Sequence, residues 1–280
     1  MSEVSIMIIS YEEFCDLLVK HIQEGEDFYI NLLKTVIDAP SRYCGLFRLS
    51  NAKTKLLQNV TQSEEIKFGD VVEEVVTEYI ERLGYTNFSK SLGKDENGDE
   101  LNVDQYFTDG KTIYMAEMKI RDDHDSTKKR GQYLNFQKKI NLLKAKHPNF
   151  HIDACMWFVD DSLVKNKKYY QEEMEKETYE NVSLHLYYGQ EYFTSLNNGE
   201  EAWNEFIEIL KRYRRKNATN IIDIPDFGSS PEIYNALRKL PRKYLIKLFS
   251  EKEQYKLLRT ELFSGGDNLR KINDEFKLSL

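Results

Sequence analysis

The chain has 280 residues, 40% of them hydrophobic, with 18 Tyr and 15 Phe, so it can form a full hydrophobic core and a disordered protein is excluded. Its three cysteines, at positions 15, 44 and 155, are scattered without Cys-x-x-Cys spacing, which argues against a disulfide framework and a thiolate zinc site and favours a reducing cytoplasm. The apolar run Ile6–Ile9 is too short for a signal peptide or a membrane span, and no longer run follows. We therefore expect a cytoplasmic globular protein without membrane association.

The amino-terminal part of the chain is predicted to be helical. Ser10 and Glu13 have the spacing of a capping box ahead of an apolar run. A second amphipathic segment covers residues 27–37 and ends before Pro40. We take residues 1–66 to be an N-terminal helical region.

Further along, strand patterns alternate with helical ones. The strongest helical periodicity extends from Lys67 to Leu83, and Gly84 supplies its stop. Strands are expected at 85–92, 100–107, 112–120, 151–159 and 182–188, and helices at 127–146, 200–215 and 231–249. The order α-β-β-β-α-β predicts an α/β core, a mixed sheet flanked by helices, with helical additions at both ends.

The formal charge of −7 is unevenly distributed along the chain. Residues 211–280 contain 16 Lys and Arg against 9 Asp and Glu, a balance of +7 that leaves −14 for residues 1–210. Arg212, Arg214 and Arg215 lie in the densest basic run, where they could contact nucleic-acid phosphates. A solvated helix face would have the same composition.

Residues 100–120 predict a β-hairpin that carries two carboxylates and a lysine. Asp109-Gly110 is a strong signal for a two-residue type I′ turn. This turn would pair Thr108 with Lys111 and Asp104 with Met115, and Glu117 would lie diagonally across from Asp104. Because side chains alternate between the faces of a strand, Asp104, Glu117 and Lys119 are expected on one polar face. Val103, Ala116 and Met118 are expected on the opposite, apolar face.

This polar face has the composition of a metal-dependent phosphodiesterase. Hydrolysis of a phosphodiester requires charge neutralisation, a nucleophilic hydroxide and a stabilised leaving oxygen, and Mg²⁺ held by carboxylates serves all three. Asp104 and Glu117 are the candidate metal ligands, and Lys119 would place an ammonium near the attacking water. The alternative is a solvated strand with alternating charges.

Asp104 followed by Glu117-x-Lys119, in this order of elements, resembles the PD-(D/E)XK nuclease superfamily. The helix with Gly69-x-x-x-Glu73 and the ending Leu83-Gly84-Tyr85 resembles the helix that opens the core of many relatives. The resemblance covers about residues 67–190 by element order. The chain differs from the motif at Val103, which stands in place of the Pro that gives the motif its name. This position varies widely in the superfamily.

The size of the chain and the lack of a helicase or other module make it similar to type II restriction endonucleases. The resemblance implies a part in a restriction-modification system: sequence-specific, Mg²⁺-dependent cleavage of double-stranded DNA that leaves 5′-phosphate and 3′-hydroxyl ends. It also implies a homodimer, because one active site cuts one strand and a twofold protein matches a palindrome. We expect the nuclease core at 67–216, and a basic, DNA-contacting helical region at 217–280 that begins with a linker at 217–230. The alternatives are a repair or junction-resolving nuclease of the same fold and a non-catalytic nucleic-acid-binding module.

Further site candidates flank the hairpin. Glu73 lies at the edge of an apolar helical stripe, where it could be an accessory catalytic residue or a solvated flank. The cluster at 122–125 could form a metal site around His124 or a polar loop. The remaining histidines, at 21, 147, 151 and 185, have no partner spacing, so ordinary packing or surface positions are expected for them.

Three cations open the helix at 127–146, where the helix dipole disfavours them. Lys128, Lys129 and Arg130 in its first turn therefore suggest a phosphate partner. Gln132 resembles a glutamine on the corresponding helix of some nucleases of the superfamily. We include all four as candidate DNA-binding residues.

Overall fold

A computed structural model describes residues 8–22, 25–45, 47–95, 97–120, 126–217 and 224–277. The chain divides into two compact units. Unit 1 consists of residues 1–17 and 69–217, and unit 2 consists of residues 18–68 and 218–280. The segments before and after the predicted core thus pack mainly with each other, and residues 8–17 belong with the core.

Unit 1 is built on a five-stranded sheet in the order β1-β4-β5-β6-β7. Strand β5 pairs antiparallel with β4 and parallel with β6, so the sheet is mixed, and β2 and β3 form a separate antiparallel ribbon. The strands are β1 (Thr86–Asn87), β2 (Ser91–Lys94), β3 (Glu100–Asn102), β4 (Gln105–Thr108), β5 (Thr112–Lys119), β6 (His151–Phe158) and β7 (Val182–Tyr188). The segments predicted as single strands at 85–92 and 100–107 are each divided between the sheet and the ribbon.

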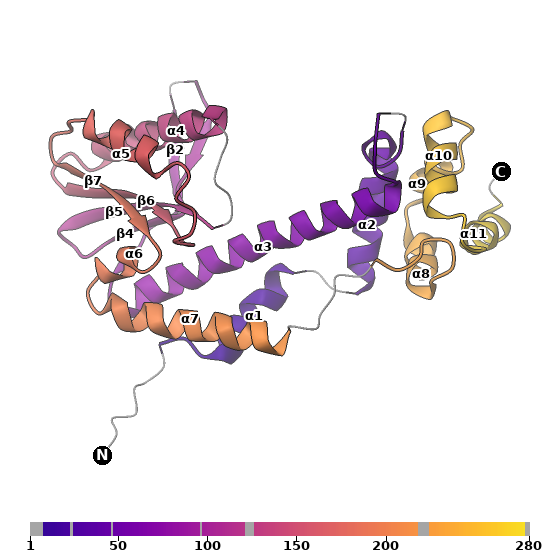
Figure 1. The fold of residues 1–280 in the computed structure, drawn as a ribbon, viewed down its shortest axis with the longest axis horizontal. Helices are drawn as coiled ribbons and strands as arrows, with labels where there is room; N and C mark the ends of the chain where they lie inside the picture. The colour runs from indigo at the N-terminus through magenta and orange to yellow at the C-terminus, as the bar shows by residue number, and fades with distance from the viewer. Residues whose placement is uncertain are drawn as a thin grey trace, which may run out of the picture. The chain divides into compact units, whose positions relative to one another are not determined.

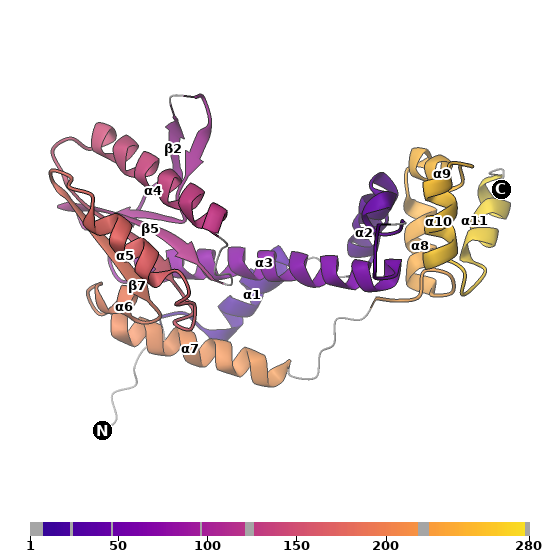
Figure 2. The same ribbon diagram turned by 45° about the horizontal axis from the view of Figure 1, so that its top comes forward.

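Helices cover both faces of this sheet (Figures 1 and 2). Helices α4 (Ser126–Lys146) and α5 (Lys167–Glu175) lie on one face. The C-terminal part of α3 (Ala52–Arg82), with α6 (Glu191–Thr194) and α7 (Gly199–Lys216), lies on the other. The order α3, β1, β4, β5, α4, β6 reproduces α-β-β-β-α-β, so the predicted fold class is confirmed.

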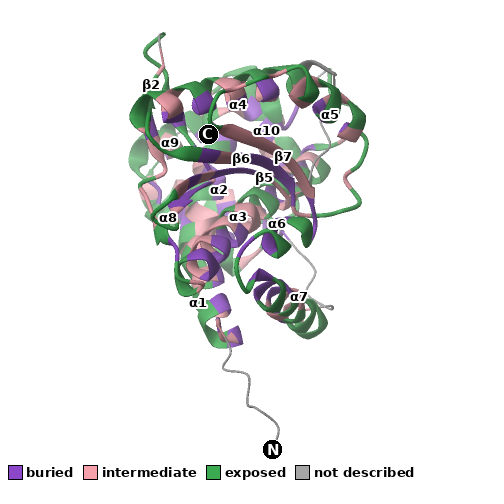
Figure 3. Cartoon of the chain, turned by 90° about the vertical axis from the view of Figure 1, so that its left-hand side faces the viewer, coloured by how far each residue is buried: buried purple, intermediate pink, exposed green. Residues whose placement is uncertain are grey.

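The central strands are buried because of this double cover. Six of the eight residues of β6 are buried, and Figure 3 shows the same for much of β5. On the α4 side, Phe136 and Ile140 pack in a cluster with Met115. On the other side, the ring of Trp157 stacks on Tyr192 with 4.4 Å between centroids. A sheet buried on both faces gives near-continuous apolar runs, as β6 has in the sequence.

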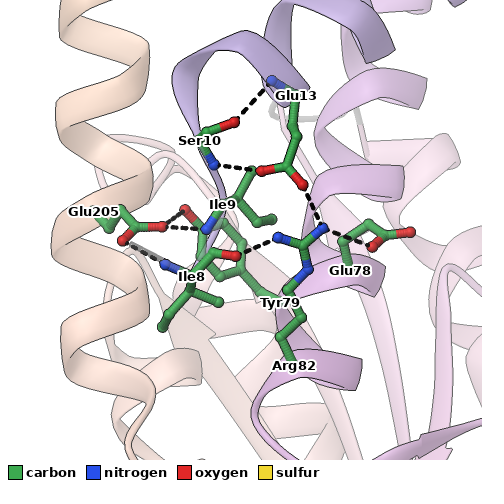
Figure 4. Close-up of polar contacts among 8 residues, drawn as sticks. All are labelled: Ile8, Ile9, Ser10, Glu13, Glu78, Tyr79, Arg82 and Glu205. Atoms are coloured by element: carbon green, nitrogen blue, oxygen red, sulfur yellow. Dashed lines mark hydrogen bonds and ion pairs between the residues drawn. The ribbon is translucent and has the colours of Figure 1, made fainter. Parts of the chain in front are cut away.

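The start of the chain is fixed to unit 1 by polar contacts (Figure 4). The capping box at the start of α1 (Tyr11–His21) is confirmed, since Glu13 N–H donates to the Ser10 hydroxyl and Ser10 N–H donates to the Glu13 carboxylate. The Glu205 carboxylate of α7 accepts hydrogen bonds from the backbone N–H groups of Ile8 and Ile9, at 2.9 and 2.7 Å, and from the Tyr79 hydroxyl at 3.0 Å. One carboxylate thus joins α3 and α7 to the segment before α1.

Unit 2 is a helical unit with its own core. It contains α2 (Glu26–Asp38), the 3₁₀ helix η1 (Pro40–Arg42), the first part of α3, α8 (Pro231–Lys239), α9 (Arg242–Leu248), α10 (Glu253–Leu262) and α11 (Asn268–Phe276). Leu33 and Ile37 of α2, Leu237 of α8 and Leu258 of α10 belong to this core.

One prediction in this part of the chain is wrong. The single helix predicted at 231–249 is divided into α8 and α9, because Pro241 has no N–H to continue α8. The segment expected as a linker at 217–230 contains the boundary between the units, after Asn217, and its residues Ile224 and Phe227 are buried in the core of unit 2. All three cysteines are free thiols. Across the described ranges of the chain, no helix has the length and apolarity that a membrane span needs.

Candidate active site

The connection between β4 and β5 is wider than the predicted two-residue turn. The register pairs Thr108 with Ile113 and Tyr106 with Met115, two positions away from the predicted pairing. The reason is the Asp109 side chain, whose Oδ1 accepts hydrogen bonds from the N–H groups of Lys111 and Thr112 and so stabilises a four-residue loop. Only Gly110 in this loop has a positive φ, whereas a type I′ turn needs two such residues.

A shift of two residues keeps the side chains of the paired strands β4 and β5 on their predicted faces, but it changes which residues are level with each other. Continuing the register by one step from the Gln105–Ala116 pair brings Asp104 level with Glu117, in place of the predicted diagonal. The assignment of Val103 to the opposite face is wrong, since it packs in the cluster that contains Met115. Asp104 lies at a bend before β4, and this bend interrupts the alternation.

The face with Glu117 is not an open polar surface. Helix α4 covers it, and Glu117 is 8% exposed. Asp104 and Lys119 are half-buried at its edge. The carboxylate of Asp104 accepts a hydrogen bond through Oδ2 from the backbone N–H of Met118, at 2.6 Å. This bond fixes Asp104 beside the strand that carries the other two candidate residues.

Two lysines flank Glu117 at different distances. Lys139 of α4 donates a hydrogen bond from Nζ to Glu117 Oε1, at 2.5 Å. Lys119 Nζ lies 3.9 Å from the other oxygen, Oε2, which is close enough for an ion pair but too far for a hydrogen bond. One oxygen of Glu117 is therefore held in place, and the ammonium of Lys119 lies near the second.

The environment of Glu117 raises its pKa to about 7. Burial is the largest cause, and repulsion from Asp104 adds to it, whereas Lys139 and Lys119 act in the opposite direction. A buried glutamate whose charge is only partly compensated provides a site where a further cation would be favourable.

Glu73 approaches this region from α3. Burial raises the pKa of its carboxyl, and repulsion from Asp104 contributes, while a hydrogen bond from Lys90 opposes the rise. Lys90 Nζ lies 2.5 Å from Glu73 Oε1. The backbone carbonyl of Glu73 accepts a hydrogen bond from Gln105 Nε2 at 2.8 Å, and this bond ties α3 to β4 next to Asp104.

The carboxylates fit the requirements of Mg²⁺, which usually takes one or two carboxylates from a protein and completes its shell with water and phosphate oxygens. Asp104 and Glu117 each use one oxygen in an anchoring hydrogen bond, and no hydrogen bond from another described residue reaches the second oxygen of either. In the described part of the chain, no set of three or more His, Cys, Asp or Glu side chains is arranged to hold a metal. A cation here would therefore depend on these two carboxylates and on oxygens from outside the protein.

Comparison with known proteins identifies the family. The family described as "Type II restriction endonuclease, HinfI" matches residues 10–99 and, in a second overlapping segment, residues 83–214. The chain belongs to the HinfI family of type II restriction endonucleases. The matched residues cover most of the chain and include the whole hairpin, so the protein is a site-specific deoxyribonuclease that acts on DNA. A search of curated proteins found no match.

The candidate DNA-binding residues of α4 differ in their contacts and in their exposure to solvent. Lys129 Nζ lies 4.4 Å from the centroid of the Tyr169 ring, so its charge is engaged in a cation–π contact. Lys128 and Arg130 are exposed. The side-chain oxygen of Gln132 is buried and has no hydrogen-bond partner among the described residues. The Asp-His cluster at 122–125 lies outside the described residues.

The three arginines of α7 also differ from each other. Arg212 lies over the ring of Tyr11, with 4.0 Å to the centroid, and forms an ion pair with Glu12 at 3.5 Å. Arg214 and Arg215 are exposed on the same helix. Arg212 thus stabilises the contact with α1, and the other two remain candidates for phosphate contacts.

Sequence reasoning missed Lys139, Lys90 and Gln105. Lys139 interrupts an apolar stripe made of Phe136, Ile140 and Leu143, and a lysine in such a stripe signals a buried carboxylate partner. Gln105 is fully buried between α3 and β5. Its position inside an otherwise apolar strand was a comparable signal. Lys90 offered none, because it lies in a polar segment.

Proposed function

We propose that the protein is a PD-(D/E)XK nuclease that cleaves double-stranded DNA with Mg²⁺, leaving 5′-phosphate and 3′-hydroxyl ends. One observation carries this proposal. Asp104 and Glu117 are each anchored through a single oxygen, and Lys119 lies beside the second oxygen of Glu117. Membership of this family favours a restriction endonuclease over the two alternatives, which are a repair or junction-resolving nuclease and a non-catalytic nucleic-acid-binding module.

Each residue has a role in this proposal. Asp104 and Glu117 would hold Mg²⁺, which when bound neutralises the phosphate, activates water and stabilises the leaving oxygen. Lys119, half-buried and 3.9 Å from Glu117, would orient the attacking water and stabilise the charge that develops on the phosphate. Glu73 would hold a water at the α3 side of the site, because Lys90 restrains its carboxylate there.

We propose that DNA phosphates are contacted by Lys128 and Arg130 of α4 and by Arg214 and Arg215 of α7. These side chains are exposed cations on the unit that carries the hairpin. Unit 2 would contribute as well, since it contains 18 Lys and Arg against 15 Asp and Glu, whereas unit 1 contains 22 against 32. Basic groups elsewhere on the protein would compensate for the repulsion between the acidic metal site and the DNA backbone.

We also propose a homodimer that acts in the cytoplasm. Breaking both strands of a palindrome at fixed positions needs two active sites related by a twofold axis. Free thiols at all three cysteines are consistent with a reducing compartment. Light scattering of the protein–DNA complex should give two subunit masses, and a complex with one subunit mass that yields lasting nicked circles would contradict the dimer.

The function is tested by digesting plasmid DNA of known sequence with purified protein and Mg²⁺, with a chelator in the control reaction. We expect discrete fragments, and sequencing of their ends should reveal one recurrent site with 5′-phosphates. Cleavage confined to branched junctions would favour the junction-resolving alternative. Cleavage that persists in the presence of the chelator would contradict the metal-dependent mechanism.

A further inference from the structure

The position of Lys139 on α4 is unusual for a lysine. It lies within the helix face that packs on the sheet, next to Ile140 and one turn from Phe136 and Leu143, all of which are buried. Lys139 itself is 6% exposed. It therefore cannot act as a surface contact for DNA.

A buried ammonium needs a partner that compensates its lost hydration. Glu117 provides it, since Lys139 Nζ donates to Glu117 Oε1 at 2.5 Å. The second lysine of the site, Lys119, makes no hydrogen bond to the same carboxylate. The two ammonium groups thus have different relations to Glu117: Lys139 fixes the carboxylate, and Lys119 only lies near it.

We propose that Lys139 is a positioning residue that holds one oxygen of Glu117 and thereby presents the other oxygen to the divalent cation. This inference rests on the proposed metal-dependent function. The anchor on Glu117 matches the one on Asp104, whose Oδ2 is held by the Met118 N–H. Both ligands would thus be oriented before the cation arrives, one by a backbone donor and one by a side chain from another element.

Orientation in advance matters here because the two carboxylates repel each other. The register brings Asp104 level with Glu117, so a mobile Glu117 side chain would turn away from the Asp104 charge. Groups that orient a metal ligand from behind typically affect metal affinity by about 10- to 100-fold. Lys139 would also leave the Lys119 ammonium available for the attacking water.

The neighbouring Lys138 offers a matched control. It is on the same helix, but its side chain is 48% exposed and its Nζ lies 2.7 Å from Oδ2 of Asp95, the residue that follows β2. Lys138→Met and Lys139→Met change the composition of the helix equally, but only Lys139→Met removes a hydrogen bond to Glu117.

The test measures Ca²⁺ binding by titration calorimetry in the full-length protein, so that affinity is obtained without turnover. Lys139→Met should weaken Ca²⁺ binding by about 10- to 100-fold, Lys139→Arg should recover most of the affinity, and Lys138→Met should bind as the wild type does. If the methionine variant fails to fold by circular dichroism, Lys139→Gln replaces it, because glutamine is too short to reach Glu117 as lysine does. Lys139→Gln should lose the same 10- to 100-fold in Ca²⁺ affinity, about as much as Lys139→Met.

Wild-type or tighter Ca²⁺ binding by Lys139→Met would overturn the inference. Equal losses of Ca²⁺ affinity in Lys139→Met and Lys139→Arg would overturn it as well. Glu117→Gln, measured in the same way, separates this failure from failure of the proposed function. If Glu117→Gln also binds Ca²⁺ normally, the proposed metal site is wrong. If it loses binding while Lys139→Met retains it, only the role of Lys139 is wrong.

Discussion

The Asp104 carboxylate accepts a 2.6 Å hydrogen bond from the backbone N–H of Met118. Met118 is the residue between Glu117 and Lys119, so this single bond connects the two halves of the candidate site. It also gives Asp104 two separable properties: an oxygen that accepts a hydrogen bond, and a charge that is available to a cation.

Asparagine at position 104 should separate these two properties. Asp104→Asn keeps an oxygen that can accept from Met118, so its free energy of unfolding should stay close to that of the wild type, whereas Asp104→Ala leaves the N–H unpaired and should cost about 1–3 kcal/mol. Both variants lose the charge and should lose several orders of magnitude in cleavage rate. Urea denaturation and single-turnover kinetics give the two quantities. An active Asp104→Asn enzyme would mean that the charge has no catalytic role.

Ca²⁺ affinity should depend on pH through Glu117. Its pKa is raised to about 7, mainly by burial, so below pH 7 a cation must displace a proton, and affinity should fall about tenfold for each pH unit. The folded state binds this proton more tightly than the unfolded state, so the metal-free protein should lose stability as pH rises from about 4.5 to 7. Calorimetric titrations with Ca²⁺ at pH 6 and pH 8 measure the first effect. Equal dissociation constants would contradict it.

The exposed arginines of α7 should contribute to the salt dependence of DNA binding. Replacing Arg214 and Arg215 with glutamine should weaken binding and lower the log–log salt slope by about one unit for each phosphate that is no longer neutralised. The matched control is the double lysine variant, which keeps both charges and should bind nearly as the wild type does. An unchanged slope in the glutamine variant would show that this helix end is only solvated. Arg212→Gln should instead reduce stability, because Arg212 contacts Tyr11 and Glu12.

Glu205 should be important for stability because three donors converge on it (Figure 4). Glu205→Gln replaces one acceptor oxygen with an NH₂ group, so at least one donor loses its partner, at a cost of about 1–3 kcal/mol. Glu208→Gln, one turn along α7 and 63% exposed, should change the free energy of unfolding by less than about 0.5 kcal/mol. Equal effects of the two substitutions in urea denaturation would argue against the anchoring role of Glu205.

The sequence was sufficient to predict the order of the sheet elements and the capping box, because both depend on local periodicity and local side-chain chemistry. The register was not predictable, since the type I′ signal of Asp109-Gly110 competes with hydrogen bonds from the loop backbone to the Asp109 side chain. The two-residue error left Asp104, Glu117 and Lys119 on their predicted faces because the side-chain period of a strand is two.

The surroundings of the candidate site were less predictable because they depend on tertiary packing. The hairpin alone indicated a polar face open to solvent, and only the crossover through α4 covers it and brings Lys139 to Glu117. The basic balance of residues 211–280 was also misleading, because some of its lysines form ion pairs with acidic residues from the first part of the chain. Lys239 and Lys247, which belong to the basic balance of residues 211–280, form ion pairs with Glu26 and Asp38 of α2 in unit 2.

The most direct test of the account is the single-turnover cleavage rate of Glu117→Ala and Lys119→Ala with Mg²⁺, combined with DNA affinity measured in Ca²⁺. Glu117→Ala leaves the buried Lys139 ammonium without its partner, so circular dichroism must first show that each variant is folded. We expect cleavage to fall by several orders of magnitude in each, while the Lys119 variant binds DNA nearly as the wild type does. Cleavage near the wild-type rate by either variant, in preparations free of contaminating nuclease, would place the active site elsewhere and contradict the account.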